Sequence, residues 1–397
     1  MSGWKRYKLS ELYEMSSGIS STKEQAGHGS PFLSFSVVFN NYFLPDSLID
    51  LMDTTVSEKQ KYSINEGDIF LTRTSETVDE LAMSSVALKD YPEASFSGFL
   101  KRLRPVDKTI VYPKFMAFYL RSPLFRRTII NNTVMTLRAS FNEAMFSYLE
   151  IMLPDFDTQK KIGDFLYSLE KKKQINNQIN QELEAMAKTL YDYWFVQFDF
   201  PDQNGKPYKS SGGQMVYNPE LKLEIPEGWG VTKVGELQIA TGKRDANFGT
   251  ENGKYDFWTT ANSPIKADEF SFEGKAILIA GNGNFYVNFT EGKFEAYQRT
   301  YVIQSEDENM LIFMYMACLQ SAEKLRKGSN GSIIKYITIS DVNNISSPYD
   351  YNVVDEFVKI YRPLIDQISK NKKQNQELTQ LRDWLLPMLM NGQVKVE

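Results

Sequence analysis

Two long stretches of the chain place apolar residues at every third or fourth position, which is the spacing of one helix face. The first runs from about Thr158 to Phe198, contains no proline and is rich in Lys, Glu, Gln and Leu. Its stripe consists of Ile162, Leu166, Leu169, Lys173, Asn176, Asn180, Leu183, Ala187, Leu190 and Trp194. The pattern predicts one long helix over this stretch.

The second stretch repeats the stripe 195 residues further along. Its positions are Phe357, Tyr361, Leu364, Ile368, Asn371, Asn375, Leu378, Arg382, Leu385 and Leu389. Both stripes are apolar at the ends and polar in the middle, which is typical of a heptad seam whose polar layer fixes the register. We therefore predict two paired helices, with a kink or a later start at Pro363. Two separate amphipathic helices, each packed on its own domain, are the alternative.

Other matches indicate that the rest of the chain is duplicated as well. Trp4, Glu11, Leu12 and Gly18 correspond to Trp229, Glu236, Leu237 and Gly242. The segment EGDIFL at 66–71 resembles EGKAIL at 273–278, in both cases a turn followed by a β-prone run. Phe115 and Met116 correspond to Phe313 and Met314 at the start of apolar helical segments.

The repeats predict an α+β fold with two globular domains in a pseudo-two-fold repeat, separated by two long antiparallel helices that form a coiled coil. A length of 397 residues also exceeds what one core usually organises. We place the first domain at 1–156, the first helix at 157–198, the second domain at 226–350 and the second helix at 351–397. The segment 199–225 is rich in Gly, Pro, Ser and Asn and is predicted to be a connector.

Composition restricts the chemistry of the chain. The one cysteine, Cys318, lies in the apolar run from Met310 to Leu319, so an internal disulfide and a cysteine-based metal site are excluded, and we expect a buried core thiol. The one histidine, His28, lies in a Gly-rich stretch that is typical of an exposed loop. Catalytic triads and zinc sites are therefore poorly supported. That apolar run is too short to span a bilayer and the N-terminal residues lack a signal-peptide core, so we expect a cytoplasmic protein.

Motifs for nucleotide chemistry are missing from the sequence. The five Gly-Lys pairs lack the Ser or Thr of a phosphate-binding loop, and neither G-x-G-x-x-G nor the Pro-Pro-Tyr signature of amino-methyltransferases occurs. Two loose nuclease patterns are present, Asp155 with Glu170 and Lys172, and Asp202 with Glu220 and Lys222. Metal-dependent cleavage requires such carboxylates to converge on one ion. A standalone metal-dependent endonuclease is therefore kept as an alternative function.

Charge is distributed unevenly along the chain. The net charge of −5 argues against a protein that coats DNA through charge alone. One segment nevertheless contains nine basic residues against the single acidic Asp107: Lys101, Arg102, Arg104, Lys108, Lys114, Arg121, Arg126, Arg127 and Arg138. A smaller cluster in the second half consists of Lys324, Arg326, Lys327 and Lys335. The two clusters predict phosphate-binding surfaces, with solvated helix faces as the alternative. We expect the interspersed aromatics Phe99, Tyr112, Phe115, Phe118, Tyr119 and Phe125 to be core residues.

Two segments resemble a known family, the specificity subunits of Type I restriction-modification systems. They are EGDIFLTRT at 66–74 and the junction that leads from Leu153 and Pro154 to QKKI at 159–162. The similarity covers nearly the whole chain and lies mainly in the duplicated order of its elements. It implies a non-catalytic subunit whose two domains each read one half of a split, asymmetric site in double-stranded DNA. It also implies two methyltransferase subunits that use S-adenosylmethionine, nuclease-translocase subunits that use Mg²⁺ and ATP, and no cofactor in this chain.

DNA reading requires loop side chains at base edges and cations on the neighbouring phosphates. We predict base contacts from Thr72, Arg73, Thr74 and Arg138 in the first domain, and from Asn282, Asn284, Ser332 and Lys335 in the second. The candidates for phosphate contacts are Lys101, Arg102, Arg126 and Arg127. The second half departs from the family pattern, because AGNGN at 280–284 replaces the Thr-Arg loop. A structural adaptor that does not bind DNA is the other alternative function.

Overall fold

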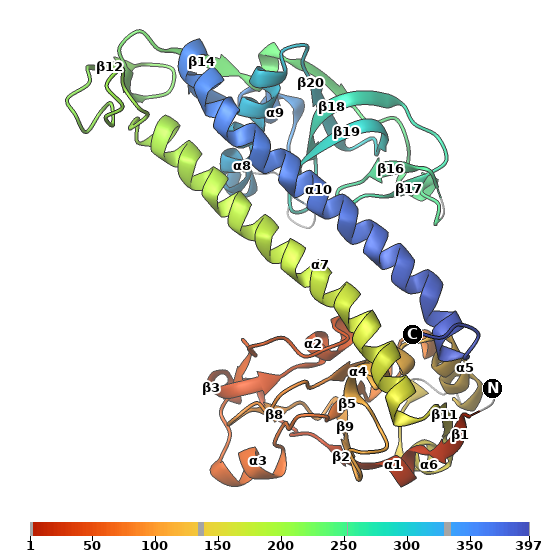
Figure 1. Cartoon of the computed structure of the whole chain (residues 1–397). Helices are drawn as coiled ribbons and strands as arrows, with labels where there is room; N and C mark the ends of the chain where they lie inside the picture. Colours follow the sequence, from red (N-terminus) through yellow and green to blue (C-terminus); the bar gives the residue numbers. More distant parts are fainter. Residues whose placement is uncertain (1–2, 134–138, 252, 329–334, 397) are drawn as a thin grey trace. The chain divides into compact units, whose positions relative to one another are not determined.

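The computed structural model describes residues 3–133, 139–251, 253–328 and 335–396, and it divides into two compact units (Figure 1). Unit 1 comprises Met1–Asn177 with Lys372–Glu397, and unit 2 comprises Gln178–Asn371. Two long helices, α7 (Phe156–Tyr191) and α10 (Tyr351–Met390), therefore contribute a segment to each unit.

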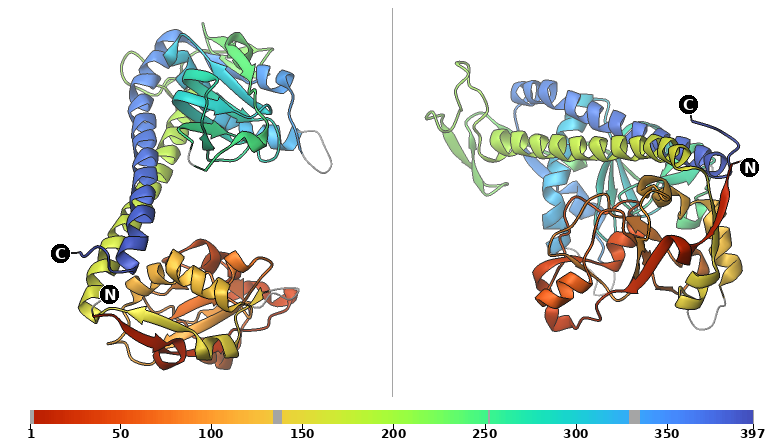
Figure 2. Two further views of the ribbon diagram at one scale, coloured as in Figure 1. Left: turned by 90° about the vertical axis from the view of Figure 1, so that its right-hand side faces the viewer. Right: turned by 60° about the horizontal axis from the view of Figure 1, so that its bottom comes forward.

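Over its described residues, unit 1 is built on a four-stranded antiparallel sheet in the order β2-β9-β5-β7. The strands are β2 (Tyr13–Ser17), β9 (Leu100–Pro105), β5 (Ile69–Thr72) and β7 (Ser84–Val86). A smaller sheet joins β4 (Leu51–Met52), β3 (Ala26–Leu33) and β8 (Ser95–Phe96), and β6 (Thr74–Ser75) pairs with β10 (Ala139–Ser140). Figure 2 shows β1 (Lys5–Lys8), in red, beside its partner β11 (Glu150–Leu153), in yellow.

Short helices complete unit 1. They are α1 (Leu9–Leu12), α2 (Phe35–Asn40), α3 (Val56–Lys61), α4 (Pro113–Tyr119), α5 (Pro123–Asn132) and α6 (Glu143–Tyr148), with 3-10 turns η1 (Lys23–Gln25) and η2 (Val78–Glu80). One apolar cluster joins Leu103 of β9 to Phe115 of α4 and Leu166 of α7, and a second joins Leu100 of β9 to Phe96. Apolar side chains thus cover both faces of β9, which makes it an interior strand.

Unit 2 is built on a six-stranded sheet in the order β15-β20-β18-β19-β16-β17 over its described residues. The strands are β15 (Gln238–Thr241), β20 (Thr300–Gln304), β18 (Phe272–Ala280), β19 (Val287–Ala296), β16 (Tyr255–Trp258) and β17 (Ile265–Ala267). Helix α8 (Glu308–Gly328) packs on β18 and β19, which are drawn in teal in Figure 1. Unit 2 also contains β14 (Gly230–Lys233) paired with β21 (Ser346–Tyr349), α9 (Ile339–Asn343), and the 3-10 turns η4 (Val234–Glu236) and η5 (Ala246–Phe248).

Each unit therefore packs helices on a mostly antiparallel sheet, which confirms the prediction of a duplicated α+β fold. The matched tryptophans mark the same place in both repeats, since Trp4 precedes β1 and Trp229 precedes β14, the strands that pair with β11 and β21. His28 is exposed as expected, but it lies in strand β3 rather than in a loop.

The segment 199–225 is more ordered than a Gly- and Pro-rich connector suggests. After α7 the chain forms a π-helical turn, η3 (Asp192–Val196), and then a hairpin of β12 (Met215–Asn218) and β13 (Leu223–Pro226). Phe200 stacks on Tyr208 and on Trp229, with ring centroids 4.8 and 5.0 Å apart. These aromatic contacts attach the segment to the core of unit 2.

The start of α7 fits tightly against α4 in unit 1. Asp155 caps the helix, because its Oδ1 accepts a hydrogen bond of 2.8 Å from the amide of Thr158. A Cβ at Gly163 would lie 2.6 Å from the backbone nitrogen of Phe115, so only glycine permits this approach of the two helices. The side-chain amide of Gln159 donates to the carbonyl of Ile110 at 2.9 Å and adds a polar anchor.

Within each unit, the segments of α7 and α10 run antiparallel and share a core. In unit 1, Leu166 and Leu169 lie in one apolar cluster with Leu389, and Asn176 Nδ2 donates to Oδ1 of Asn375 at 2.9 Å. In unit 2, the rings of Trp194 and Phe357 lie 5.9 Å apart. There Asn371 Nδ2 donates to Oδ1 of Asn180 at 2.8 Å.

Pro363 does not mark the start of the second helix. Helix α10 begins at Tyr351 and continues through Pro363. Val354, Phe357 and Tyr361 are buried in the core of unit 2, and this burial holds the first turns of the helix in place. The expectation of a later start was therefore wrong, because packing outweighs the lost backbone hydrogen bond of one proline.

Candidate nucleic-acid interface

Arg73 lies on an exposed loop of unit 1 that two neighbouring segments hold in place. Its backbone amide donates to the carbonyl of Phe99 at 2.9 Å, and its carbonyl accepts from the amide of Phe141 at 2.9 Å. The side chain is exposed, with one long hydrogen bond of 3.5 Å from Nη1 to the carbonyl of Gly98. A fixed backbone with a long exposed cation is suited to reaching a base edge.

Unit 2 repeats this hydrogen-bond frame around a different residue. The amide of Gly281 donates to the carbonyl of Arg299 at 2.7 Å, and the carbonyl of Gly281 accepts from the amide of Ile337 at 3.0 Å. Next to it, Asn282 forms a β-bridge with Tyr336, as Thr74 pairs with Ser140 in unit 1. The position of Arg73 is thus occupied by Gly281.

A tight turn in each unit carries the hydrogen-bond partner of that loop. In unit 1 the amide of Leu100 donates to the carbonyl of Ser97 at 2.9 Å, and in unit 2 the amide of Thr300 donates to that of Tyr297 at 2.7 Å. The exposed tips of these turns are Phe99 and Arg299. Phe99 is 67% exposed, so its predicted place in the core was wrong. The other five aromatics of that prediction are buried or half-buried.

This equivalence corrects the sequence match between the two halves by one residue. The match aligns Leu71 with Leu278. In the structure Leu71 pairs with Lys101 of β9. The residue of unit 2 that corresponds to Lys101 is Tyr301 of β20, and Tyr301 pairs with Ile279. Leu71 is therefore equivalent to Ile279 and not to Leu278. The error arises because the glycine of EGKAIL, Gly274, lies inside the long strand β18 and not in a turn before it.

Thr72 and Thr74 differ in what they can contact. Thr72 is fully buried, and its hydroxyl accepts from the amide of Met83 at 2.9 Å and donates to the carbonyl of Glu80 at 3.3 Å. The prediction that Thr72 reads a base is therefore wrong. Thr74 is half-buried in β6 and keeps part of its surface accessible.

Lys101 and Arg102 were predicted to bind phosphates, but both are buried in the interior strand β9. Lys101 Nζ lies 3.2 Å from Oε1 of Glu143. Arg102 Nη1 donates to the carbonyl of Ser63 at 2.7 Å, and its guanidinium lies over the ring of Phe96. Burial also lowers the pKa of Arg102. Neither cation is available to DNA in this conformation.

The other basic residues of this segment divide in the same way. Arg121 donates hydrogen bonds to four backbone carbonyls, and burial lowers its pKa to about 10. Arg126 is half-buried and donates to the carbonyl of Asp79 at 2.7 Å, whereas Arg127 is exposed. Of the four predicted phosphate contacts only Arg127 is exposed, so the described basic residues of this segment do not form one continuous surface patch.

Asn284 and Lys335 come together in unit 2. Both are exposed, and Asn282 on the same loop as Asn284 is half-buried. Arg326 of α8 donates from Nε to the carbonyl of Asn284 at 3.0 Å, and Lys335 Nζ donates to the carbonyl of Arg326 at 3.1 Å. The second basic cluster thus lies beside the Asn-rich loop. Arg138 and Ser332 lie outside the described residues.

The carboxylates of the two nuclease-like patterns have structural partners instead. Asp155 caps α7, and Glu170 of α7 accepts a hydrogen bond of 2.5 Å from Arg382 of α10, so each carboxylate already has a partner. Asp202 accepts from two amides of its own turn, and Glu220 lies 2.5 Å from Lys233. Within the described ranges, no group of three or more metal-ligating side chains is assembled.

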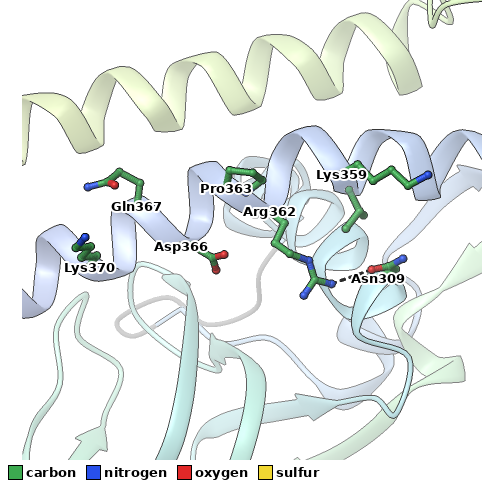
Figure 3. Close-up of a pocket in the computed structure, with 8 residues that line it drawn as sticks. Asn309, Lys359, Arg362, Pro363, Asp366, Gln367 and Lys370 are labelled. Atoms are coloured by element: carbon green, nitrogen blue, oxygen red, sulfur yellow. Dashed lines mark hydrogen bonds between the residues drawn. The ribbon is translucent and has the colours of Figure 1, made fainter.

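The hollow in Figure 3 lies along one side of α10 in unit 2. It has a volume of about 560 Å³ and is lined by α10 and by Asn309 of α8. Arg362 is occupied, because it donates to Oδ1 of Asn309 at 2.8 Å and to Glu308 at 2.5 Å. Cys318 is buried as expected, and burial raises the pKa of its thiol. None of the helices in the described residues has the length and apolar character of a membrane span.

Comparisons with known proteins match most of the chain. Residues 1–185 and 226–380 match the family model of the Type I restriction modification DNA specificity domain. The EcoDI specificity subunit of Escherichia coli is 34% identical over 186 residues, which cover 44% of this chain and 40% of that protein. The MjaIX specificity subunit of Methanocaldococcus jannaschii is 28% identical, with 63% of this chain and 61% of that protein covered. Both matches span less than two thirds of the relative's length.

Two further comparisons extend over nearly the full length. The HindI specificity subunit of Haemophilus influenzae is 23% identical, with 99% of this chain and 100% of that protein covered. A crystal structure of a Type-I restriction-modification S subunit from M. genitalium superimposes with a TM-score of 0.60 at 15% identity. That likeness covers 97% of this chain and 96% of the other, and it supports the fold.

Proposed function

Because this chain belongs to the family of the Type I restriction modification DNA specificity domain, we propose that it is a DNA-specificity subunit that reads a bipartite, asymmetric site. Each unit reads one half of that site. The observation that carries the proposal is the duplicated frame, in which the same two backbone hydrogen bonds fix Arg73 in unit 1 and Gly281 in unit 2. Two copies of one loop scaffold with different side chains are what two different half-sites require.

Base reading in unit 1 is assigned to Arg73 and Thr74, with Arg127 on a neighbouring phosphate. An arginine can donate two hydrogen bonds to the major-groove edge of guanine, and a threonine contacts several bases. In unit 2 the accessible candidates are Asn282, Asn284 and Lys335, which lie around one loop. Asparagine amides pair with the adenine edge, so the two halves are expected to differ in sequence.

Specificity subunits of Type I restriction systems are not enzymes, since catalysis belongs to their partner subunits. In our proposal two methyltransferase subunits bind this chain and use S-adenosylmethionine. Nuclease-translocase subunits that use Mg²⁺ and ATP join where the system has them. The complex acts on double-stranded DNA in the cytoplasm, and this chain holds no cofactor of its own.

The long helices serve two purposes in this proposal. Their paired segments act as a coiled-coil spacer that sets the gap between the half-sites, and their outer faces bind the methyltransferase subunits. Support comes from the antiparallel contacts within each unit and from the asparagine pairs, since polar residues in such a seam fix the register. Exposed apolar side chains such as Trp384 on α10 supply contact surface for a partner.

The decisive test is methylome sequencing of cells with and without this gene, with the modification subunit present in both. We expect one bipartite motif to be methylated only when the gene is present. Binding of the purified complex to that motif should weaken steeply as salt rises. If the chain alone cleaves DNA with Mg²⁺, it is an endonuclease. If no sequence-dependent binding or methylation is found, the alternative of a structural adaptor that does not bind DNA is favoured.

A further inference from the structure

The two hydrogen-bonded pairs at the proposed reading sites each contain one arginine, but in opposite positions. In unit 1 the loop residue is Arg73 and the turn residue is Phe99. In unit 2 the loop residue is Gly281 and the turn residue is Arg299. Residues paired across adjacent strands have their side chains about 5 Å apart. An arginine side chain at either residue of the pair therefore leaves the backbone at nearly the same point on the surface of the unit.

The surroundings of Gly281 explain why the arginine of unit 2 is on the turn. A Cβ at this position would lie 2.5 Å from the carbonyl oxygen of Arg299 and 3.2 Å from the ring of Tyr301. The first of these contacts is with backbone that is hydrogen-bonded to Gly281 itself and cannot move away. No side chain fits at this position without displacing the strand pair, so the loop of unit 2 cannot present an arginine as Arg73 does.

The side chain of Arg299 is accessible, in contrast to its basic neighbour. Arg299 is exposed, and among the described residues no acidic side chain pairs with it. Arg244, on the adjacent segment, lies 2.6 Å from Glu269 and 3.4 Å from Glu295, with its guanidinium over the ring of Phe248. Arg244 is thus committed to the fold. Several backbone hydrogen bonds fix the turn that presents Arg299, among them one from the amide of Gln298 to the carbonyl of Arg244 at 2.9 Å.

We propose that Arg299 is the specificity-determining arginine of unit 2 and reads a guanine edge in the half-site of that unit. The inference rests on the proposed function and deepens it. Arg299 takes the role that Arg73 has in unit 1, and Asn282 and Asn284 of the neighbouring loop contact flanking bases. The exposed Phe99 occupies the equivalent turn in unit 1 and makes an apolar contact beside the base that Arg73 reads.

The test uses the full chain in complex with its modification subunits. Three variants are compared by methylome sequencing and by competition binding with each half-site scrambled in turn: Arg299→Ala, Arg299→Lys and the control Lys206→Ala. Arg299→Ala should degrade one half of the motif at a guanine, with a roughly 5- to 150-fold loss of preference there. Arg299→Lys should lose most of that preference, because lysine cannot supply the two-pronged contact. Lys206→Ala removes a charge from the exposed connector of the same unit and should leave the motif unchanged.

Other outcomes separate this inference from the proposed function. If Arg299→Ala leaves the bipartite motif intact, Arg299 is not a reading residue, although the specificity-subunit proposal stands. If Arg299→Ala weakens binding equally to all sequences and lysine restores it, the side chain contacts phosphate and the base-reading assignment is wrong. If the wild-type complex methylates no defined motif, the proposed function itself fails. Thermal unfolding of each variant should match the wild type, since Arg299 is exposed.

Discussion

Arg104 holds Asp68 through two parallel hydrogen bonds, 2.8 Å from Nε to Oδ1 and 2.6 Å from Nη2 to Oδ2. The Asp68 side chain is 1% exposed and also accepts a hydrogen bond from the amide of Asn65 at 2.8 Å. The aspartate of the EGDIFL segment is therefore a structural residue of unit 1. In unit 2, Ala276 is at the position of Asp68 and Gln304 is at the position of Arg104. Both charged residues of the ion pair are thus replaced, and neither remains as an unpaired charge.

Removing one partner of this pair should destabilise unit 1 strongly. Asp68→Ala leaves Arg104 without its counter-ion in a partly buried place, which costs about 3 kcal/mol, at the lower end for buried pairs because the Arg104 side chain is 29% exposed. The double variant Asp68→Ala, Arg104→Gln recreates the pair of unit 2 and should recover much of that loss. Urea unfolding of the three chains measures both effects. A double variant as unstable as the single one would contradict the argument.

The sequence predicted those features that depend on local periodicity. The helix stripe from Ile162 to Trp194 and the repeat of Trp4 at Trp229 are visible because they follow fixed spacings. Burial inside a sheet depends on contacts between residues far apart in the sequence. The basic segment from Lys101 onwards was therefore predicted to be a surface, although apolar clusters pack on both faces of β9. The roles that we propose for Phe99 and Arg299 depend on hydrogen bonds between segments far apart in the sequence, and no spacing in the sequence encodes them.

Acid should weaken the junction between α7 and α4 through Asp164. Burial by itself would raise the pKa of Asp164, but hydrogen bonds from Lys114, Tyr112 and Lys160 outweigh it and hold the pKa at about 2. Because the pKa is lower in the folded chain than the unfolded value of about 3.9, the stabilisation is complete above that value and is lost as the pH falls towards 2.

Thermal unfolding as a function of pH tests this expectation. Asp164→Asn should lower the unfolding midpoint at pH 7, and its difference from the wild type should shrink as the pH falls from about 4 to about 2. Asp157→Asn makes the same chemical change at an exposed residue in the first turn of α7 and is the control. A difference for Asp164→Asn that stays constant down to pH 2 would show that charge at this position is unimportant.

Arg73→Ala should relax recognition of one half-site, since a base-reading arginine contributes about 1–3 kcal/mol of discrimination. Competition binding with each half-site scrambled in turn measures the effect. Thr72→Val is the matched neighbour: it should reduce stability, because a buried amide loses its acceptor, and leave the motif unchanged. Equal loss of both half-sites in Arg73→Ala would indicate a phosphate contact or a folding defect.

Trp384→Ala should weaken the association with the methyltransferase subunits. Trp384 is 66% exposed on α10 and Leu381, one helical turn before it, is 40% exposed, so the pair offers an apolar contact surface. A truncated tryptophan at the centre of an interface typically costs at least about 2 kcal/mol. Dissociation constants from co-purified subunits provide the measurement. Val56→Ala, at a 71% exposed residue on α3, should have no effect, and wild-type affinity of Trp384→Ala would exclude this surface.

The spacer role of the helices can be tested by lengthening both of them. Seven residues inserted after Leu169 and seven after Leu378 fall on the same side of the Asn176 and Asn375 pair, so the pair stays in register. At about 1.5 Å rise per residue each insertion adds roughly 10 Å, which corresponds to about three base pairs of DNA. The methylated motif should keep both halves, and the gap between them should widen by about three base pairs. The insertion also rotates the half-sites around the duplex, and this result requires that the DNA can deform to match that rotation. Methylome sequencing of the double insertion gives the answer. Active methylation with an unchanged gap would show that the helices do not set the spacing.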